Sequence, residues 1–208
     1  MKRLIVILIV LIVSMVFLAA CGGAGTSTPT RGQWDGNTFT SSFFGLRLDI
    51  PDDWTAMTES EIQGAYQFFG VDAIAPGEAV TPEAFDNADH TSMIDMMAVA
   101  GEGGMVMVGD MQSMIALSIN LLTSDEVNMN ADQWLAHIMQ EAGAPRRVGE
   151  DAVRIGSLDW YYVDSVIAGT TSMQRMFANI EGRFVRLITI GYQNETQLNQ
   201  YMGFFRSY

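Results

Sequence analysis

Apolar and polar residues alternate along much of the chain, and this pattern predicts the strands of a sheet. Alternation with a period of two is typical of a strand with one buried face. It predicts a short β-like segment and three longer strands, at residues 37–42, 43–50, 93–100 and 113–121. Pro51 ends the second of these because proline cannot donate to a ladder. Between the last two strands we expect either a long hairpin loop or an extra strand at residues 105–108.

Helical spacing appears at three places between and after these strands. Thr58 and Glu61 form a capping box that opens a helix over residues 59–69. A second helix over residues 131–142 is expected to begin at Asn130, with Thr123 as the alternative cap and Gly143 as its end. Its apolar face is predicted to contain Trp134, Leu135, Ile138 and Met139. A short helix at residues 82–85 follows the breaker Pro82.

The last third of the chain predicts an antiparallel meander followed by a helix. Its four strands are expected at residues 152–155, 158–167, 172–180 and 183–190. The turns between them are predicted at Gly156-Ser157, Gly169-Thr170 and Glu181-Gly182. A helix over residues 195–206 ends the chain, with Leu198, Tyr201, Met202 and Phe205 on one face. The element order predicts an α+β fold, with helices covering an antiparallel sheet.

The first long hairpin of the meander has a predicted register. A two-residue turn at Gly169-Thr170 pairs Asp164 with Arg175, and Tyr162 with Phe177. Directly paired residues share a face of the sheet. We expect Asp164 and Arg175 to pair beneath a helix or at its margin, and an exposed pair is the alternative.

The second long hairpin extends this register. A turn at Glu181-Gly182 pairs Phe177 with Arg186, and Arg175 with Ile188. One face of the sheet should then carry Asp164, Arg175 and Arg186 together with Tyr162, Phe177 and Ile188.

The N-terminus predicts export and lipid attachment. Lys2 and Arg3 precede an apolar run at residues 4–17, which is too short to span a bilayer but typical of a signal peptide. Leu18-Ala19-Ala20-Cys21 follows directly. This pattern resembles the bacterial lipoprotein signal. The resemblance implies cleavage after residue 20, a diacylglyceryl thioether on Cys21, and acyl chains such as palmitate that hold the protein on the extracytoplasmic face of the cell membrane.

The residues behind Cys21 predict a tether and one domain. Residues 22–33 are rich in Gly, Ser, Thr and Pro, which is typical of a flexible linker. We therefore expect a signal peptide at residues 1–20, a lipidated tether at residues 21–36 and a domain at residues 37–208. Cys21 is the only cysteine, so disulfides, thiol nucleophiles and cysteine-based metal sites are excluded.

Charge is distributed unevenly along the chain. The net charge is −13, and no Lys or Arg lies between Arg47 and Arg146, where 17 Asp and Glu residues occur. Nothing forms a basic stripe, so nucleic-acid binding is disfavoured. An acidic domain is also repelled by anionic lipid headgroups, and membrane attachment would depend on the lipid on Cys21.

A short stretch near the start of the domain resembles a known family. Phe44-Gly45-Leu46-Arg47-Leu48-Asp49-Ile50-Pro51-Asp52-Asp53-Trp54 is similar to the opening strand of PsbP-like domains. The predicted meander and final helix fit the same family over residues 37–208. The resemblance implies an α/β/α sandwich of the MOG/PsbP type and an accessory or binding role without catalysis. It assigns no functional residue, since Gly45, Pro51 and Trp54 are fold residues.

Candidate chemistry is sparse. No Gly-x-Ser-x-Gly, Ser-x-x-Lys or His-Glu-x-x-His motif occurs, and Lys2 is the only lysine, so we expect no enzyme and no cofactor. His137 is predicted as a partly buried helix residue. Asp86, Asp89 and His90 could bind a divalent cation, although their spacing matches no EF-hand and a solvated loop is the alternative.

Methionine is the unusual component. Seven of them fall within 22 residues, at Met93, Met96, Met97, Met105, Met107, Met111 and Met114. Thioethers fill irregular cores and form adaptable binding surfaces, and they also bind Cu(I), for which Met105 and Met107 are candidates with His90 nearby. All three roles remain open on the sequence alone.

These observations predict a membrane-anchored binding or accessory lipoprotein, with a possible protein partner in the cell envelope. A metal- or copper-binding lipoprotein is the alternative, and a small hydrolase is a third class. A two-lobed solute receptor is disfavoured because about 175 residues with one meander cannot supply two lobes.

Overall fold

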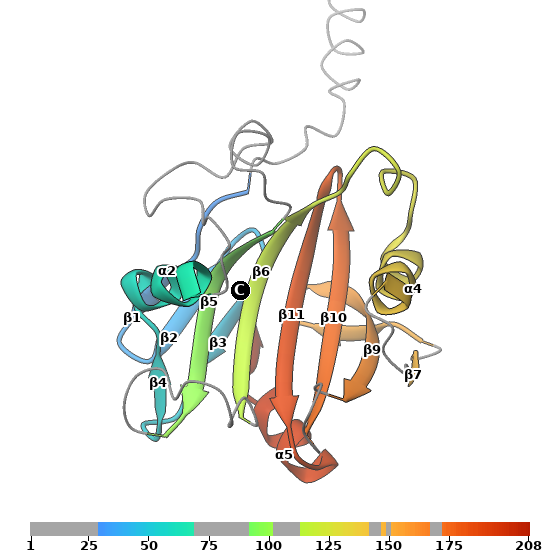
Figure 1. The fold of residues 1–208 in the computed structure, drawn as a ribbon. Coiled ribbons are helices and arrows are strands. Elements are labelled where there is room, and N and C mark those ends of the chain that lie inside the picture. Colours follow the sequence, from blue (N-terminus) through green and yellow to red (C-terminus); the bar gives the residue numbers. More distant parts are fainter. Residues whose placement is uncertain (1–28, 69–91, 102–112, 142–146, 149–150, 167–171) are drawn as a thin grey trace, which may run out of the picture.

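A computed structural model gives the structure of the protein and describes residues 29–68, 92–101, 113–141, 147–148, 151–166 and 172–208. Within these residues the larger sheet has eight strands and is antiparallel throughout (Figure 1). Its strands, in spatial order, are β4 (Trp54–Ala56), β5 (Ser92–Ala100), β6 (Met114–Leu121), β11 (Phe184–Tyr192), β10 (Met173–Glu181), β9 (Leu158–Val166) and β7 (Arg147–Val148), with β8 (Val153–Ile155) paired to β9.

A second, four-stranded sheet packs against one face of the larger one. Its strands are β1 (Gln33–Asp35), β2 (Thr38–Ser41), β3 (Leu46–Asp49) and β12 (Phe205–Ser207). Figure 1 shows β2 and β3 passing behind β5 and β6. We predicted that helices cover the sheet, and this is incomplete. One face is covered by the small sheet, which buries apolar side chains as a helix would.

The main core lies between the two sheets. Phe39, Leu46 and Leu48 extend from the small sheet and are buried. The large sheet contributes buried residues from alternate positions, including Met93, Met96, Ile115, Leu117, Ile119, Phe177, Ile188 and Ile190. The rings of Phe44 and Trp160 stack with centroids 6.3 Å apart. This alternation is the pattern from which the strands were predicted.

The described residues form three helices beside the large sheet: α2 (Glu59–Phe68), α4 (Ala131–Glu141) and α5 (Glu195–Met202). The Thr58 capping box is confirmed, with the Thr58 amide donating to Glu61 Oε2 at 2.7 Å. Asn130 is confirmed as the cap of α4, since its Oδ1 accepts from the Gln133 amide at 2.8 Å.

The helix α4 forms a second core with the other face of the sheet. It lies over β9 and β10 (Figure 1). Trp134, Leu135 and Met139 are buried as predicted, against sheet residues that include Val163, Met176 and Val185. His137 is half-buried, as expected.

The predicted register is correct for the first long hairpin and wrong by two residues for the second. Asp164 pairs with Arg175 and Tyr162 with Phe177. In the second hairpin Phe177 pairs with Ile188, Arg175 with Ile190, and Asn179 with Arg186. Glu181 stays in the ladder opposite Phe184, and the turn is formed by Gly182, at φ +61°, with Arg183. A slip of two residues preserves the face, so the set of residues predicted to share that face is correct, whereas their predicted cross-strand partners are wrong.

Two further element bounds differ from the prediction. The strand expected from residue 43 begins at Leu46, because residues 42–45 form a turn in which Gly45 has φ +62°. The helix expected to reach residue 206 ends at Met202. Phe205 then pairs with Leu48 at the edge of the small sheet, where it is buried.

The remaining predictions have mixed outcomes. Trp54 covers the sheet edge from β4 and is buried against Tyr201 and Phe204. The turn at Gly156-Ser157 is confirmed by the pairing of Ile155 with Leu158. Outside the described residues lie Cys21, the segments at residues 82–85 and 105–108, Gly143 and the turn at Gly169-Thr170.

Candidate functional site

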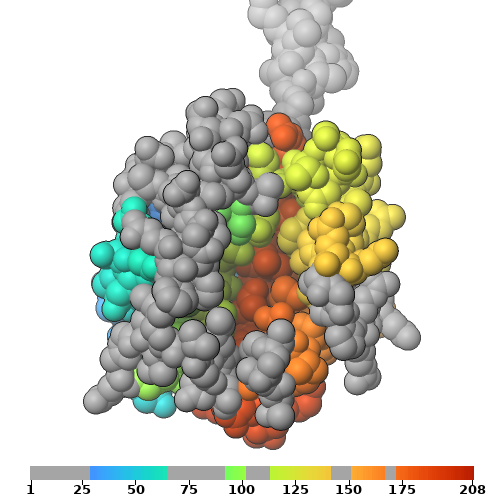
Figure 2. All heavy atoms as spheres, viewed as in Figure 1, coloured from blue at the N-terminus to red at the C-terminus, as the bar shows by residue number. Residues whose placement is uncertain are grey.

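The face of the large sheet that carries α4 is hollowed beside that helix. Figure 2 shows a depression next to α4 whose floor has the colours of β11 and β10. Cross-strand pairs place Met97, Ala116, Thr189 and Met176 in one row across this face. We call the sheet hollow the following set of residues on this face: Met97, Met114, Ala116, Ser118, Asn120, Gln174 and Thr189. Met114, Ala116 and Ser118 are buried, and the other four are half-buried.

The sheet hollow has hydrogen-bonding groups but no formal charge. Its residues are Ser, Thr, Asn, Gln, Ala and Met, although the chain as a whole has a net charge of −13. Asn120 Nδ2 donates to Ser118 Oγ at 3.4 Å, and Gln174 Nε2 donates to Ser165 Oγ at 2.9 Å. Four of its seven side chains are polar and can hydrogen-bond a ligand, and they lie beside the apolar side chains of Met97, Met114 and Ala116.

The methionines of residues 93–114 lie in different environments. Met93 and Met96 are each 1% exposed in the core between the sheets. They share that face because the register shifts between Ile94 and Met96. Met97 and Met114 lie on the opposite face, in the sheet hollow. The copper candidates Met105 and Met107, together with Met111, lie outside the described residues.

The register shift in β5 places one carboxylate where the N-terminal segment reaches the sheet. Asp95 accepts from the Gly32 amide, at 3.2 Å to Oδ1 and 3.1 Å to Oδ2. Burial is the largest effect on this carboxyl and raises the pKa of Asp95 to about 6, although the Gly32 hydrogen bond and the charge of Arg31 act in the opposite direction. Asp95 is not a candidate on the sequence alone, because a bulge gives no local signal in one strand.

Gly32 lies where a side chain does not fit. A Cβ atom at this position would lie 2.0 Å from Cζ of Phe39, whose ring is 1% exposed. The absence of a side chain therefore lets the Gly32 amide approach Asp95.

The predicted Asp164–Arg175 pair forms a partly buried network. Arg175 donates from Nε to Asp164 Oδ1 at 2.6 Å and from Nη2 to Oδ2 at 2.8 Å. Tyr192 donates its hydroxyl to Asp164 Oδ1 at 3.1 Å. Arg175 also lies 4.6 Å from the centre of the Tyr162 ring and 3.6 Å from Glu195 in the first turn of α5. The expected position at a helix margin is therefore correct.

Arg175 and Tyr192 both have raised pKa values in this network. Burial alone would lower the pKa of Arg175, but its hydrogen bond to Asp164 and the Asp164 charge raise it above its ordinary value. Burial, followed by the Asp164 charge, raises the pKa of Tyr192 to about 12. Neither group can exchange protons at physiological pH, so the network is suited to holding β9, β10 and β11 together.

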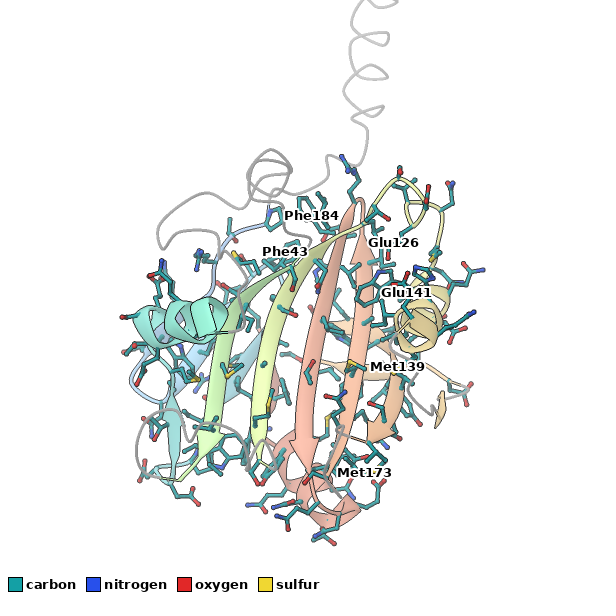
Figure 3. All side chains as sticks on the ribbon, in the orientation of Figure 1. Phe43, Glu126, Met139, Glu141, Met173 and Phe184 are labelled. Atoms are coloured by element: carbon teal, nitrogen blue, oxygen red, sulfur yellow. The ribbon has the colours of Figure 1, made fainter. Side chains whose placement is uncertain are left out.

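A second buried carboxylate lies in the turn before α4. Glu126 is 8% exposed and accepts from the Thr123 amide and hydroxyl, each at 2.8 Å, and from Trp134 Nε1 at 3.0 Å. His137 Nε2 lies 3.9 Å from Glu126 Oε1 and 3.5 Å from Glu141 Oε1. Figure 3 labels Glu126 and Glu141 near α4. The Thr-x-x-Glu spacing at residues 123–126 could have identified this turn from the sequence.

Arg186 links the large sheet to the turn before β3. It donates from Nε to the Phe43 carbonyl and from Nη1 to Asn179 Oδ1, and it pairs with Glu181. Its guanidinium lies 4.6 Å from the centre of the Phe43 ring, which contacts Phe184 edge-on (Figure 3). Burial lowers the pKa of Arg186 to about 10.

The other candidates from the sequence remain untested. Asp86, Asp89, His90 and Cys21 lie outside the described residues. In the part of the chain that the structure describes, no three His, Cys, Asp or Glu residues are grouped as a metal site would need. Among the same residues, no helix has the length and apolar character needed to cross a bilayer.

Comparison with known proteins gives only a structural likeness. No protein-family model matches the sequence, and no curated protein matches it. The solution structure of cyanobacterial PsbP (CyanoP) from Synechocystis sp. PCC 6803 is similar over 90% of this chain and 97% of that protein, with 11% identity and a TM-score of 0.45. A crystal structure from Bacteroides thetaiotaomicron VPI-5482 is similar over 84% of this chain, with 12% identity and a TM-score of 0.39, and this chain spans about half (49%) of its length. The first belongs to the family that the Phe44–Trp54 stretch resembles, but at these TM-scores neither likeness supports a statement about function.

Proposed function

We propose that the protein is a lipid-anchored, extracytoplasmic module that binds an uncharged ligand or partner segment in the sheet hollow and has no catalytic activity. The observation that carries the proposal is the contrast between an uncharged floor and a strongly acidic chain. Methionine and small polar side chains give such a floor adaptable apolar contact together with directional hydrogen bonds.

The lipid anchor rests on the sequence around Cys21. Changing Cys21 to Ser removes the thiol that would carry the lipid, so we expect the protein to leave the membrane fraction or to accumulate as an unprocessed precursor. Ser27→Ala, in the predicted tether, is the matched control and should behave as the unmodified protein. Unchanged processing and membrane retention of Cys21→Ser would show that the protein is not a lipoprotein.

The binding role is tested by photocrosslinking in whole cells. A benzophenone side chain placed at residue 189 points from the sheet hollow, whereas one at the exposed Thr196 on α5 points into solvent. We expect a discrete adduct at residue 189 that is absent at residue 196. Equal labelling at both positions, or no adduct at residue 189, would contradict a site in the sheet hollow.

A copper-binding role is the second candidate, and one observation favours it. Met97 and Met114 lie on the same face, on the two strands that flank the segment containing Met105 and Met107. Titration with Cu(I) under reducing conditions decides between the two roles. Tight one-to-one binding that is lost in the Met105→Leu, Met107→Leu double variant and survives in His90→Ala would establish a thioether site.

A further inference from the structure

The described chain starts at a fixed point on the domain. We predicted a tether over residues 21–36, but β1 lies within this range and pairs with β2. Pro29 is buried, and the Gly32 amide donates to the carboxylate of Asp95 at 3.1 Å. The folded domain therefore includes part of the predicted tether, which leaves at most residues 22–28 to separate the domain from its proposed anchor.

This starting point lies at one end of the large sheet. Thr30 Oγ1 lies 3.2 Å from Ser42 Oγ. The next residue, Phe43, contacts edge-on the ring of Phe184, which is the first residue of β11. Figure 1 shows the start of the described chain, in blue, at the end of the molecule where β10 turns into β11. The tether is therefore attached beside this turn.

The segment before α4 reaches the same end of the sheet. The Leu122 amide donates at 2.9 Å to the carbonyl of Arg183, which lies in the turn between β10 and β11. The side chain of Arg183 is exposed, and Val127 is 42% exposed. We call the tether end the set of Thr30, Ser42, Phe43, residues 123–129, Gly182 and Arg183.

The exposed charges of the tether end balance one another. Arg183 and Asp125 are exposed and have opposite charges. Glu126 is buried and accepts three hydrogen bonds. Glu181, next to the turn, pairs with Arg186. This end of the domain therefore lacks the excess negative charge of the chain as a whole, which is −13.

The opposite end of the large sheet is acidic. Two antiparallel steps separate β5 from β11, so the two strands run in the same direction and end on the same side. The Gly101 amide, directly after β5, donates to the Asp53 carbonyl at 2.7 Å, and Asp52 and Asp53 are exposed. Glu195, just after β11, has a side chain that is 69% exposed. Nine residues of β11 separate the two ends by about 30 Å.

We propose that the tether end rests on the phospholipid surface of the membrane, with Arg183 and Val127 in contact with the headgroups. The proposal rests on the lipid at Cys21 that we propose above. Residues 22–28 reach about 28 Å at full extension, and about 16 Å on average for a Gly- and Ser-rich chain. The inverted orientation would require this tether to run the length of the sheet, so the acidic end cannot rest on the membrane.

Charge favours the same orientation. The acidic end then lies several Debye lengths from the headgroups, since the Debye length is about 8 Å at physiological ionic strength. At the tether end, the guanidinium of Arg183 can pair with a headgroup phosphate, and the apolar side chain of Val127 can leave water at the lipid boundary. The strands run away from the membrane in this orientation, so the sheet hollow opens sideways, along the membrane surface.

Paramagnetic broadening in nanodiscs tests this orientation. Cys21 is the only cysteine, so residues 21–208, which include every described residue, can be coupled through its thiol to a maleimide lipid. The nanodiscs contain phosphatidylcholine, phosphatidylglycerol and a gadolinium-chelating lipid. Broadening falls with the sixth power of distance, and the ends of the sheet are about 30 Å apart. We expect the amides of residues 125–128 and 182–183 to broaden at least about 10-fold more than those of residues 52–53 and 195–197.

A double variant tests the contact itself. Arg183→Glu with Val127→Asp replaces both contacting side chains with carboxylates, so the contrast between the ends should fall below about threefold. Asp53→Asn, at the acidic end, is the matched control and should keep the full contrast. Unchanged chemical shifts in the core confirm that each variant is folded.

Two results would overturn the proposal. Equal broadening at the two ends, or stronger broadening at the acidic end, would refute the orientation. A contrast that is unchanged in the double variant would show that tether length alone orients the domain and that the tether end is not a contact surface. Because the lipid is attached chemically, these outcomes do not depend on lipidation in the cell, which the fractionation of Cys21→Ser tests separately.

Discussion

Breaking the Asp164–Arg175 pair should measurably weaken the domain, because the pair is shielded from water. The side chains of Asp164 and Arg175 are 9% and 18% exposed and are joined by two hydrogen bonds. Among the described residues, Asp164→Ala leaves the guanidinium with the exposed Glu195 carboxylate and the Tyr162 ring. It also leaves the Tyr192 hydroxyl without the Asp164 acceptor. Removing one member of a buried pair costs about 3–5 kcal/mol. We expect about 3 kcal/mol, because Glu195 remains near Arg175.

Removing Arg175 instead of Asp164 should also destabilise the domain. Arg175→Ala leaves the carboxylate with the Tyr192 hydroxyl as its hydrogen-bond donor among the described residues, and about 2–3 kcal/mol should be lost. The double variant removes both charges, so it should cost less than the sum of the single changes. We expect a coupling energy of about 1.5–3 kcal/mol.

Urea unfolding followed by tryptophan fluorescence measures all four proteins of this cycle. The exposed cross-strand pair of Arg154 and Asp159 is the matched control, with a contact of 3.0 Å and side chains 61% and 67% exposed. Its coupling energy should stay below about 1 kcal/mol. Equal coupling in the two cycles, or a value for Asp164–Arg175 within about 0.5 kcal/mol of zero, would refute the reasoning from burial.

Three further outcomes are expected from the same unfolding assay. Gly32→Ala should destabilise the domain by about 1–3 kcal/mol, since the added Cβ overlaps the buried Phe39 ring, and an unchanged unfolding midpoint would contradict this packing. Glu126→Ala removes the acceptor of three hydrogen bonds and should cost about 2 kcal/mol, whereas Glu141→Ala, whose side chain is 69% exposed, should change the free energy of unfolding by less than about 0.5 kcal/mol. The raised pKa of Asp95 stabilises the folded protein below about pH 4, and this contribution is lost as the pH rises through 6. Asp95→Asn has no such loss, so its free energy of unfolding relative to that of the unmodified protein should increase by about 2 kcal/mol between pH 4 and pH 7. A constant difference between the two proteins across this pH range would show that Asp95 has the same pKa in the folded and unfolded states.

The elements that the sequence determined by itself depend on residues close together in the chain. The caps at Thr58 and Asn130 are examples, since each is completed by a side chain three residues further on. The buried face of α4 follows from its 3.6-residue period, and the pairing of Asp164 with Arg175 follows from the alternation of two adjacent strands. Such features arise from local backbone geometry and need no knowledge of distant partners.

The tertiary structure decided which distant surfaces meet. Phe205 leaves the predicted helix to pair with Leu48, and the three-residue strand β4 exists through its distant partner β5, as no isolated three-residue strand is stable. The bulge that turns Asp95 toward Gly32 and the pairing of Glu126 with Trp134 likewise require packed neighbours. A short pattern fixes which side of a strand is apolar, but the free energy gained by burying that side depends on the surface that covers it, and this surface comes from the whole fold.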